Sequence, residues 1–135
     1  MNSVLDFAQF KADGRRISMV TGYDAWSARL IAQSHVDAVL VGDSAAMVMH
    51  GHPTTIAATV RLMTVHTSAV ARAVGEKFLI ADLPFLSHRK GIPGAMTAVG
   101  ALTASGAQAV KLEGVDGHEE VIRNIVGSGV PVMGH

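Results

Sequence analysis

The sequence contains no cysteine, no long apolar run and no excess of charge of either sign. Without cysteine, a disulfide framework and a thiolate metal site are both excluded. No apolar run approaches the ~20 residues that a membrane-spanning helix needs, so we expect no membrane partner. The formal net charge is zero and basic residues form no cluster, so nucleic acid is not an expected partner, because phosphate binding requires a dense positive surface.

Aromatic residues are also scarce at 4%, whereas 49% of the residues are hydrophobic and Ala, Val and Gly are abundant. Small side chains let helices pack closely on a sheet, so this composition favours an α/β fold. With 135 residues, we expect residues 1–135 to form a single domain with one hydrophobic core. The N-terminal segment carries both charge signs and is not a signal peptide, so a cytoplasmic location is expected.

Short aliphatic runs alternate with helical patterns, which indicates βαβ units and a parallel sheet. We expect strands at 17–21, 38–42, 77–82, 109–114 and 130–135. We expect helices at 3–12, 25–33, 60–74, 95–105 and 119–127. A long loop of about a dozen residues separates the second strand from its helix. This spacing is typical of a (βα)8 barrel or a doubly wound sheet, but no GxGxxG or P-loop motif follows a strand.

Local signals predict where several of these helices begin and end. Asp24 and Thr59 are expected N-caps, because their side chains can accept hydrogen bonds from the first helical N–H groups. Gly106 is the expected left-handed cap after residues 95–105. Asp116 and Glu119 have the spacing of a capping box for the last helix.

Three successive strands end in a carboxylate: Asp43 in "VGDS", Asp82 in "IADLP" and Glu113 in "KLEG". The carboxyl ends of neighbouring parallel strands converge, so these groups are expected to lie close together. Unneutralised, they would repel and raise one another's pKa, and Mg²⁺ is an ion that prefers such oxygen ligands. The alternative is that each carboxylate caps the next helix, although Pro84 argues against this for Asp82.

Other polar residues are expected at the same rim. Lys111 lies two residues before Glu113, so both face one side of the sheet, where the lysine either meets an anionic substrate or forms a structural salt bridge. Ser44 offers a hydroxyl to the same anion or serves only as a turn residue. His135 ends the fifth strand on this rim, and Tyr23 follows the first strand there.

The remaining singled-out histidines are expected to be structural. His50 and His52 flank Gly51, and no third ligand follows at a spacing typical of zinc, so loop packing or a helix-cap role is favoured. His66 falls on one helix face with Met63, which favours a hydrogen-bonded core histidine.

The chain resembles the N-terminal half of the ketopantoate hydroxymethyltransferase family from Arg16 to His135. The matching blocks, in order, are "VTGYDAWSARL", "VLVGDSAAMVMHGHPTT", "HTSAV", "IADLPF", "AVKLEG" and "GVPVMGH". The resemblance implies a (βα)8 barrel, here its first four βα units and a fifth strand preceded by an N-terminal helix. It also implies transfer of a hydroxymethyl group from 5,10-methylenetetrahydrofolate to 3-methyl-2-oxobutanoate, through an enolate stabilised by Mg²⁺, in pantothenate and coenzyme A biosynthesis.

By the same resemblance, Asp43, Asp82 and Glu113 form the magnesium site, and the oxo acid contacts Asp43, Ser44, Asp82 and Lys111. His135 matches a histidine at the family's active site and is a candidate catalytic residue. The family's catalytic base, a glutamate, is expected beyond residue 135, and the family implies a homo-oligomer. Ala45 and Ala46 depart from a Leu-Gly pair that often follows the "GDS" block.

Length separates the competing interpretations. A barrel of this type needs roughly 250 residues, so we expect a truncated form that lacks the catalytic base. One alternative is a related Mg²⁺-dependent lyase or mutase barrel that acts on oxo acids. Another is a non-catalytic half-barrel that requires a partner chain.

Overall fold

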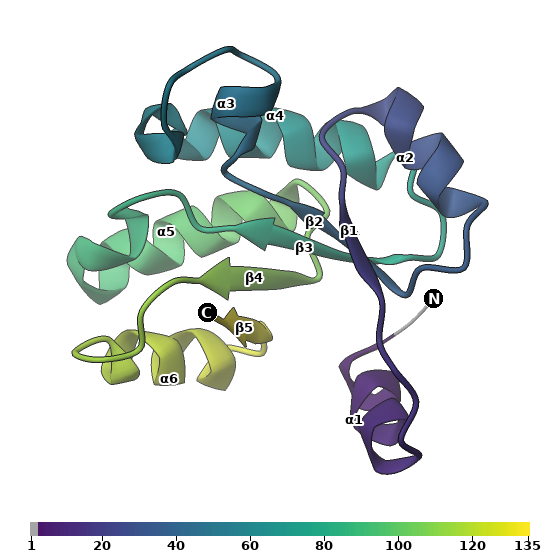
Figure 1. Ribbon diagram of the computed structural model, residues 1–135. Coiled ribbons are helices and arrows are strands. Elements are labelled where there is room, and N and C mark those ends of the chain that lie inside the picture. Colours follow the sequence, from purple (N-terminus) through teal and green to yellow (C-terminus); the bar gives the residue numbers. More distant parts are fainter. Residues whose placement is uncertain (1–2) are drawn as a thin grey trace.

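A computed structural model describes residues 3–135 as a parallel sheet covered by helices (Figure 1). The strand order is sequential and every neighbouring pair is parallel. The strands are β1 (Met19–Thr21), β2 (Ala38–Val41), β3 (Phe78–Asp82), β4 (Ala109–Leu112) and β5 (Val132–Gly134). Each lies within a range predicted from its aliphatic run, so the alternation of strands and helices is confirmed.

The longer helices also follow the predicted pattern. They are α1 (Val4–Ala12), α2 (Ala25–Ala32), α4 (Val60–Ala71), α5 (Gly91–Ala104) and α6 (Glu119–Gly127). The prediction of a plain loop after β2 is wrong, because this segment contains α3 (Ala45–Val48) and the 3₁₀ turn η1 (Thr55–Ala57). A second 3₁₀ turn, η2 (Ser87–Arg89), precedes α5. Within residues 3–135, no helix is long and apolar enough to cross a membrane.

The two faces of the sheet bury different sets of side chains. Alternate strand residues, among them Val39, Leu79 and Val110, pack with α2, α4, α5 and α6 into the main core. The other face carries a smaller cluster made of Ala38, Leu40, Phe78, Ile80 and Ala109, which packs against Phe7 of α1. The period-2 alternation of strands therefore divides the chain into a helix-covered face and a second, inner face.

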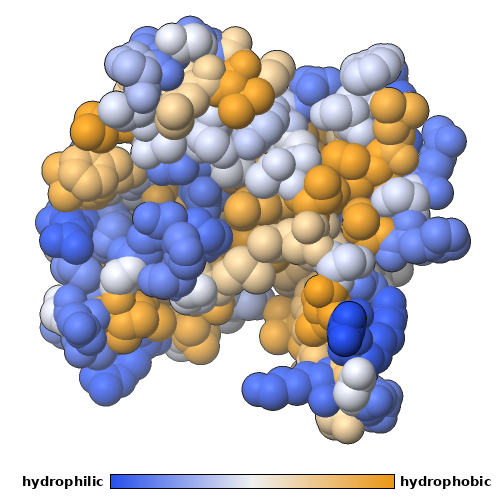
Figure 2. Space-filling view, in the orientation of Figure 1, coloured by the Kyte–Doolittle hydropathy of each residue, from blue (hydrophilic) through white to orange (hydrophobic). Residues whose placement is uncertain are grey.

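An apolar hollow of about 440 Å³ lies on this inner face, between α1 and the amino-terminal parts of the strands. Its lining includes Val4, Phe7, Met19, Phe78 and Met133. Figure 2 shows apolar side chains over this central region and polar ones on the left, where β3 and β4 end. The lining side chains are all apolar, so the hollow offers no group for acid–base or metal chemistry.

The helix-cap predictions were mostly correct. Asp24 accepts hydrogen bonds from the N–H groups of Trp26 and Ser27, and Thr59 accepts one from Leu62. Gly106 follows α5 with a φ of 109°. These observations confirm the predicted caps of α2, α4 and α5.

The predicted capping box at Asp116 is wrong. The N-cap of α6 is His118, and its side chain makes no cap hydrogen bond. Gly117 has a φ of 79°, which a helix cannot contain, so the chain enters the helix two residues later than the spacing of Asp116 and Glu119 implies.

We expect Asp37→Ala to lower the free energy of unfolding by about 2 kcal/mol. The buried Asp37 carboxylate accepts hydrogen bonds from the Ser18 N–H (2.9 Å) and hydroxyl (3.0 Å) and pairs with Arg15, and so ties β2 to β1. The Ser18 backbone bond holds the pKa of Asp37 below its usual value, although burial acts in the opposite direction. The charged Asp37 carboxylate therefore contributes fully to the stability of the fold above the ordinary aspartate pKa. This contribution is lost as the pH falls through the lowered pKa that Asp37 has in the folded protein.

Denaturant unfolding at several pH values tests this prediction. The stability difference between wild type and D37A should be largest near neutral pH and should shrink below about pH 4. The exposed Asp116→Ala is the matched control and should leave stability nearly unchanged. A difference between wild type and D37A that is constant down to pH 2 would show that the carboxylate charge plays no part.

Candidate active site

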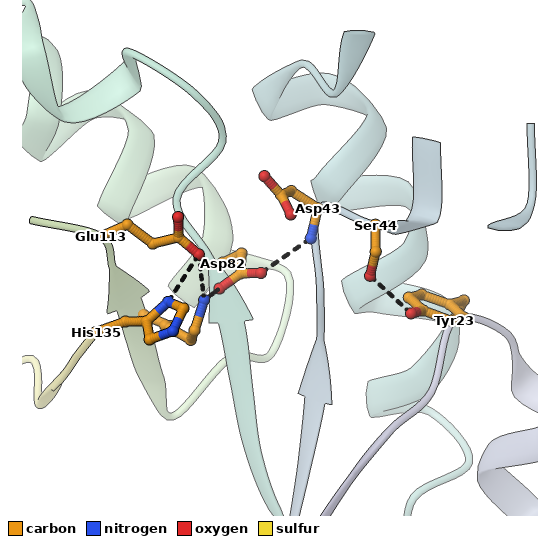
Figure 3. A network of polar contacts seen from close by, with 7 residues as sticks. Tyr23, Asp43, Ser44, Asp82, Glu113 and His135 are labelled. Atoms are coloured by element: carbon orange, nitrogen blue, oxygen red, sulfur yellow. Dashed lines mark hydrogen bonds and ion pairs between the residues drawn. The ribbon is translucent and has the colours of Figure 1, made fainter. Parts of the chain in front are cut away.

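The candidate site lies where β2, β3 and β4 end. Asp82 is the last residue of β3, and the register places it beside Lys111 on β4. Both residues continue the inner-face alternation, because Ile80 and Ala109, two residues earlier on each strand, belong to the inner cluster. Figure 3 shows Asp82 between the Asp43 side of the site and the Glu113 side. The predicted meeting of strand ends is therefore present.

Lys111 bridges two of the carboxylates. Its Nζ donates to Asp82 Oδ1 at 2.8 Å and to Glu113 Oε1 at 3.0 Å. The Lys111 and Asp82 side chains are only 11% and 7% exposed, whereas Glu113 is 61% exposed. Burial opposes the charge on Lys111, but its bonds to the two carboxylates raise its pKa overall, and the bond from Lys111 lowers the pKa of Glu113. The ammonium group thus takes the central position among the acids.

Asp43 is the carboxylate that this bridge does not reach. Its backbone N–H donates to Asp82 Oδ2 at 3.0 Å, so Asp82 connects Lys111 on one side with Asp43 on the other. Burial, followed by the negative charge of Asp82, raises the pKa of Asp43, while a hydrogen bond from Thr55 opposes this. An additional cation at this position would relieve the repulsion.

None of the three carboxylates caps a helix, so the capping alternative is wrong. The N-caps of the helices that follow β2, β3 and β4 are Ser44, Lys90 and His118, and none uses its side chain as a cap. The carboxylates are held at the strand ends by the sheet register and by Lys111 instead.

The Ser44 side chain is held by Tyr23, which lies two residues after the end of β1. Its hydroxyl lies 2.8 Å from the Tyr23 hydroxyl, and both side chains are half-buried (Figure 3). A Cβ on Gly42 would lie 2.8 Å from Ser44 Oγ and 3.5 Å from Asp82 Oδ2, so only glycine leaves these two groups in place. The next two residues, Ala45 and Ala46, are fully buried at the start of α3.

The histidines divide into two groups. His135 Nδ1 lies 3.0 Å from Glu113 Oε1, which places this residue on the acidic rim. His66 is buried, with Nδ1 2.6 Å from the Tyr23 carbonyl and Nε2 2.8 Å from His50 Nε2. These contacts confirm that His66 is a hydrogen-bonded core histidine, and they show that the exposed His50 links the loop after β2 to α4.

A polar cavity of about 290 Å³ opens at this end of the sheet. Its lining comprises Asp43, Thr55, Asp82, Leu83, Phe85, Leu86, His88, Arg89, Glu113 and Gly114. Sequence reasoning missed the loop members of this set. The one available signal was the group of basic residues in "SHRKG", which follows an acidic strand end directly. Burial lowers the pKa of His88, with the neighbouring His118 and Arg89 acting in the same direction.

The donor set suits an oxygen-liganded divalent ion such as Mg²⁺. The site nevertheless differs from a preformed metal site, because no group of three or more His, Asp or Glu side chains within residues 3–135 is already arranged to hold a metal. Asp82 Oδ1 and Glu113 Oε1 are occupied by Lys111 instead. Burial, and after it the negative charge of Asp82, raise the pKa of Asp43, so an added cation would favour its charged form.

Comparison of sequences matches residues 2–135 to the family model described as "Ketopantoate hydroxymethyltransferase". Similar proteins include the 3-methyl-2-oxobutanoate hydroxymethyltransferases of Coxiella burnetii (54% identical, covering 96% of this chain and 49% of the relative) and Bdellovibrio bacteriovorus (53%, covering 100% and 51%). The enzyme of the same name from Legionella pneumophila is 51% identical, covering 96% and 50%. The chain thus spans about half the length of these relatives.

Comparison of structures supports the fold. The chain matches oxaloacetate acetylhydrolase in complex with 3,3-difluorooxalacetate at a TM-score of 0.71 and 18% identity, covering 88% of this chain and 48% of the other. It matches 2,3-dimethylmalate lyase, a PEP mutase/isocitrate lyase superfamily member, at a TM-score of 0.70 and 18% identity, covering 96% and 52%. With the sequential parallel strand order, these matches confirm an α/β fold that forms part of a (βα)8 barrel.

Proposed function

The chain belongs to the ketopantoate hydroxymethyltransferase family, and from this premise we propose that it carries the metal and oxo-acid site of such an enzyme. The proposed reaction joins 3-methyl-2-oxobutanoate, water and the methylene group of 5,10-methylenetetrahydrofolate to give 2-dehydropantoate and tetrahydrofolate. One observation carries the proposal: carboxylates from three adjacent strand ends line one polar cavity, and Lys111 bonds two of them.

We propose that Asp43, Asp82 and Glu113 hold Mg²⁺. When bound, the ion supplies Lewis-acid stabilisation of the negative charge that develops on the oxo acid as its C3 proton leaves. Acidic oxygens at the ends of three neighbouring strands support this assignment, as does Asp43, whose pKa burial and the charge of Asp82 raise. Glu113 already lines the cavity and its side chain is 61% exposed.

Lys111 and Ser44 are proposed to bind the oxo acid. The Lys111 side chain is only 11% exposed and its ammonium bonds the cavity-lining Asp82, so it can pair with a substrate carboxylate more strongly than an exposed lysine could. The Ser44 hydroxyl, held by Tyr23, can donate a second hydrogen bond. His135 contacts Glu113 and is proposed to position that carboxylate, while the base that removes the C3 proton is expected beyond residue 135.

This arrangement predicts coupled binding of Mg²⁺ and the oxo acid. When the substrate carboxylate takes up the Lys111 ammonium, Asp82 and Glu113 regain the oxygens that this lysine occupies. We therefore expect 3-methyl-2-oxobutanoate to tighten Mg²⁺ binding by at least about tenfold, and Mg²⁺ to tighten oxo-acid binding by the same factor. Isothermal titration calorimetry in both orders of addition measures both factors.

The matched control ligand is 3-methylbutanoate, which keeps the carboxylate and lacks the oxo group that would reach the metal. It should produce a smaller effect than the oxo acid. Independent binding of Mg²⁺ and the oxo acid would contradict the shared site. Carbon–carbon cleavage of an oxo acid without consumption of methylenetetrahydrofolate would favour the lyase or mutase alternative instead.

A further inference from the structure

The Tyr23 hydroxyl shares one hydrogen bond with the Ser44 hydroxyl. Tyr23 Oη lies 2.8 Å from Ser44 Oγ, and Figure 3 shows the two side chains pointing toward each other. Each hydroxyl has a single proton, and either oxygen can be the donor. The direction of this bond therefore decides which of the two protons is left for a ligand.

The backbone around Tyr23 is fixed by three elements of the fold. The Gly22 N–H donates to the Leu40 carbonyl at 3.0 Å, so pairing with β2 continues up to the residue before Tyr23. The residue after it, Asp24, caps α2. The Tyr23 carbonyl lies 2.6 Å from Nδ1 of the buried His66 on α4. The Tyr23 hydroxyl therefore extends from a backbone that the sheet and two helices hold in place.

The bond to His66 also connects Tyr23 to the segment that carries Ser44. A carbonyl can only accept, so His66 Nδ1 carries a proton, and in neutral His66 the other nitrogen, Nε2, is an acceptor. His50 Nε2 lies 2.8 Å from His66 Nε2 and then donates to it. Ser44 and His50 lie on the two sides of α3. Tyr23 is therefore tied to this segment through its hydroxyl and, by way of His66, through its carbonyl.

Ser44 Oγ lies close to the strand-end carboxylates. A Cβ on Gly42 would be 2.8 Å from Ser44 Oγ and 3.5 Å from Asp82 Oδ2, so both oxygens border the space beside Gly42. Asp43, which joins Gly42 to Ser44, lines the polar cavity. A phenol is also a stronger hydrogen-bond donor than an alcohol, which favours donation from Tyr23 to Ser44. The serine proton is then the one available at the site.

We propose that Tyr23 is a positioning residue for the oxo acid: it donates its phenolic proton to Ser44 Oγ, and so leaves the Ser44 proton for the carboxylate of the ligand. The assignment rests on the proposed function, in which Ser44 binds the oxo acid. Tyr23 acts through Ser44 and does not touch the ligand itself. The opposite direction of the bond would use the Ser44 proton on Tyr23 and leave Ser44 no proton for the ligand.

A double-mutant cycle of Tyr23→Phe and Ser44→Ala tests the assignment on the 135-residue chain. Calorimetry with saturating Mg²⁺ gives the affinity for 3-methyl-2-oxobutanoate of wild type, Y23F, S44A and the double variant. We expect Y23F to weaken oxo-acid binding about fivefold and S44A to weaken it about tenfold. In the S44A background, Y23F should cause no further loss, because no serine hydroxyl is left for Tyr23 to orient.

Two controls separate this role from a general effect on the site. Phenylalanine keeps the aromatic ring of Tyr23 and removes no carboxylate, so Mg²⁺ titrated alone should bind Y23F within about twofold of wild type, and thermal unfolding shows that each variant is folded. Ser128→Ala on the exposed face of α6 removes a hydroxyl that bonds the Asn124 carbonyl, outside the cavity lining. This variant should keep wild-type affinity for the oxo acid.

Wild-type oxo-acid affinity in Y23F would overturn the assignment. Additive losses in Y23F and S44A would also overturn it, since they indicate that Tyr23 packs the site or touches the ligand without acting through Ser44. An equal loss of Mg²⁺ and oxo-acid affinity in Y23F has the same consequence, because it indicates a disturbed site. Failure of the proposed function has a separate sign, the absence of Mg²⁺-dependent oxo-acid binding in wild type, and it would overturn both proposals together.

Discussion

Replacing Asp82 with alanine is expected to weaken Mg²⁺-dependent binding of 3-methyl-2-oxobutanoate by about 100-fold or more. Asp82 connects the two sides of the site, because one carboxylate oxygen accepts from Lys111 and the other accepts from the Asp43 N–H. Its loss removes a proposed metal ligand and also frees the backbone that carries Asp43. Two proposed metal ligands are therefore affected by one substitution.

Calorimetry with saturating Mg²⁺ measures the loss, and a thermal unfolding curve shows that D82A is folded. Some loss of stability is expected, because Lys111 keeps only the exposed Glu113 as a partner. Asp116→Ala removes an exposed carboxylate from the β4–α6 loop, outside the cavity lining, and should keep oxo-acid affinity within about twofold of wild type. Wild-type oxo-acid affinity in folded D82A would refute the proposed role of Asp82.

Replacing Lys111 with methionine should change the two ligands in opposite directions. The oxo acid loses the ammonium that pairs with its carboxylate, so we expect its affinity to fall by about 100-fold. Mg²⁺ added alone loses a competitor, because Asp82 and Glu113 no longer hold a cation, so its affinity should rise by about tenfold. Methionine is chosen because it keeps most of the buried stem volume of lysine.

For K111M, titration of Mg²⁺ alone gives the Mg²⁺ affinity, and titration of the oxo acid with saturating Mg²⁺ gives the oxo-acid affinity. The exposed Lys11→Met on α1 removes the same charge far from the cavity and should leave both affinities near wild type. A parallel fall in both affinities would show that Lys111 supports the structure of the site and does not compete with the metal.

The elements of the fold were largely predictable from local sequence. Strand positions such as Ala38–Val41 and Phe78–Asp82 followed from short aliphatic runs, and the caps at Asp24 and Thr59 followed from side-chain chemistry that acts within three residues. The start of α5 at Gly91 was missed because "GIPG" disfavours helix by propensity, although proline is tolerated in a first turn. Asp116 failed as a cap because Gly117 turns the chain.

The candidate site was predictable only where strand order determines position. The meeting of Asp43, Asp82 and Glu113 follows from parallel neighbouring strands, and the Lys111–Glu113 contact follows from their spacing of two residues. The position of His88 could not be predicted, because it depends on a loop whose path no local rule sets. Sequence also left open whether Lys111 faces a protein acid or a ligand, since that depends on what occupies the cavity.

The central claim is that one divalent ion joins the three strand-end carboxylates to the oxo acid. A crystal structure of the chain with 3-methyl-2-oxobutanoate and Mn²⁺, located by its anomalous signal, tests this claim most directly. We predict one ion bound by oxygens of Asp43, Asp82 and Glu113 and by the oxo acid, with Lys111 Nζ moved onto the substrate carboxylate. An ion bound elsewhere, or an oxo acid bound while Lys111 still bridges Asp82 and Glu113, would contradict it.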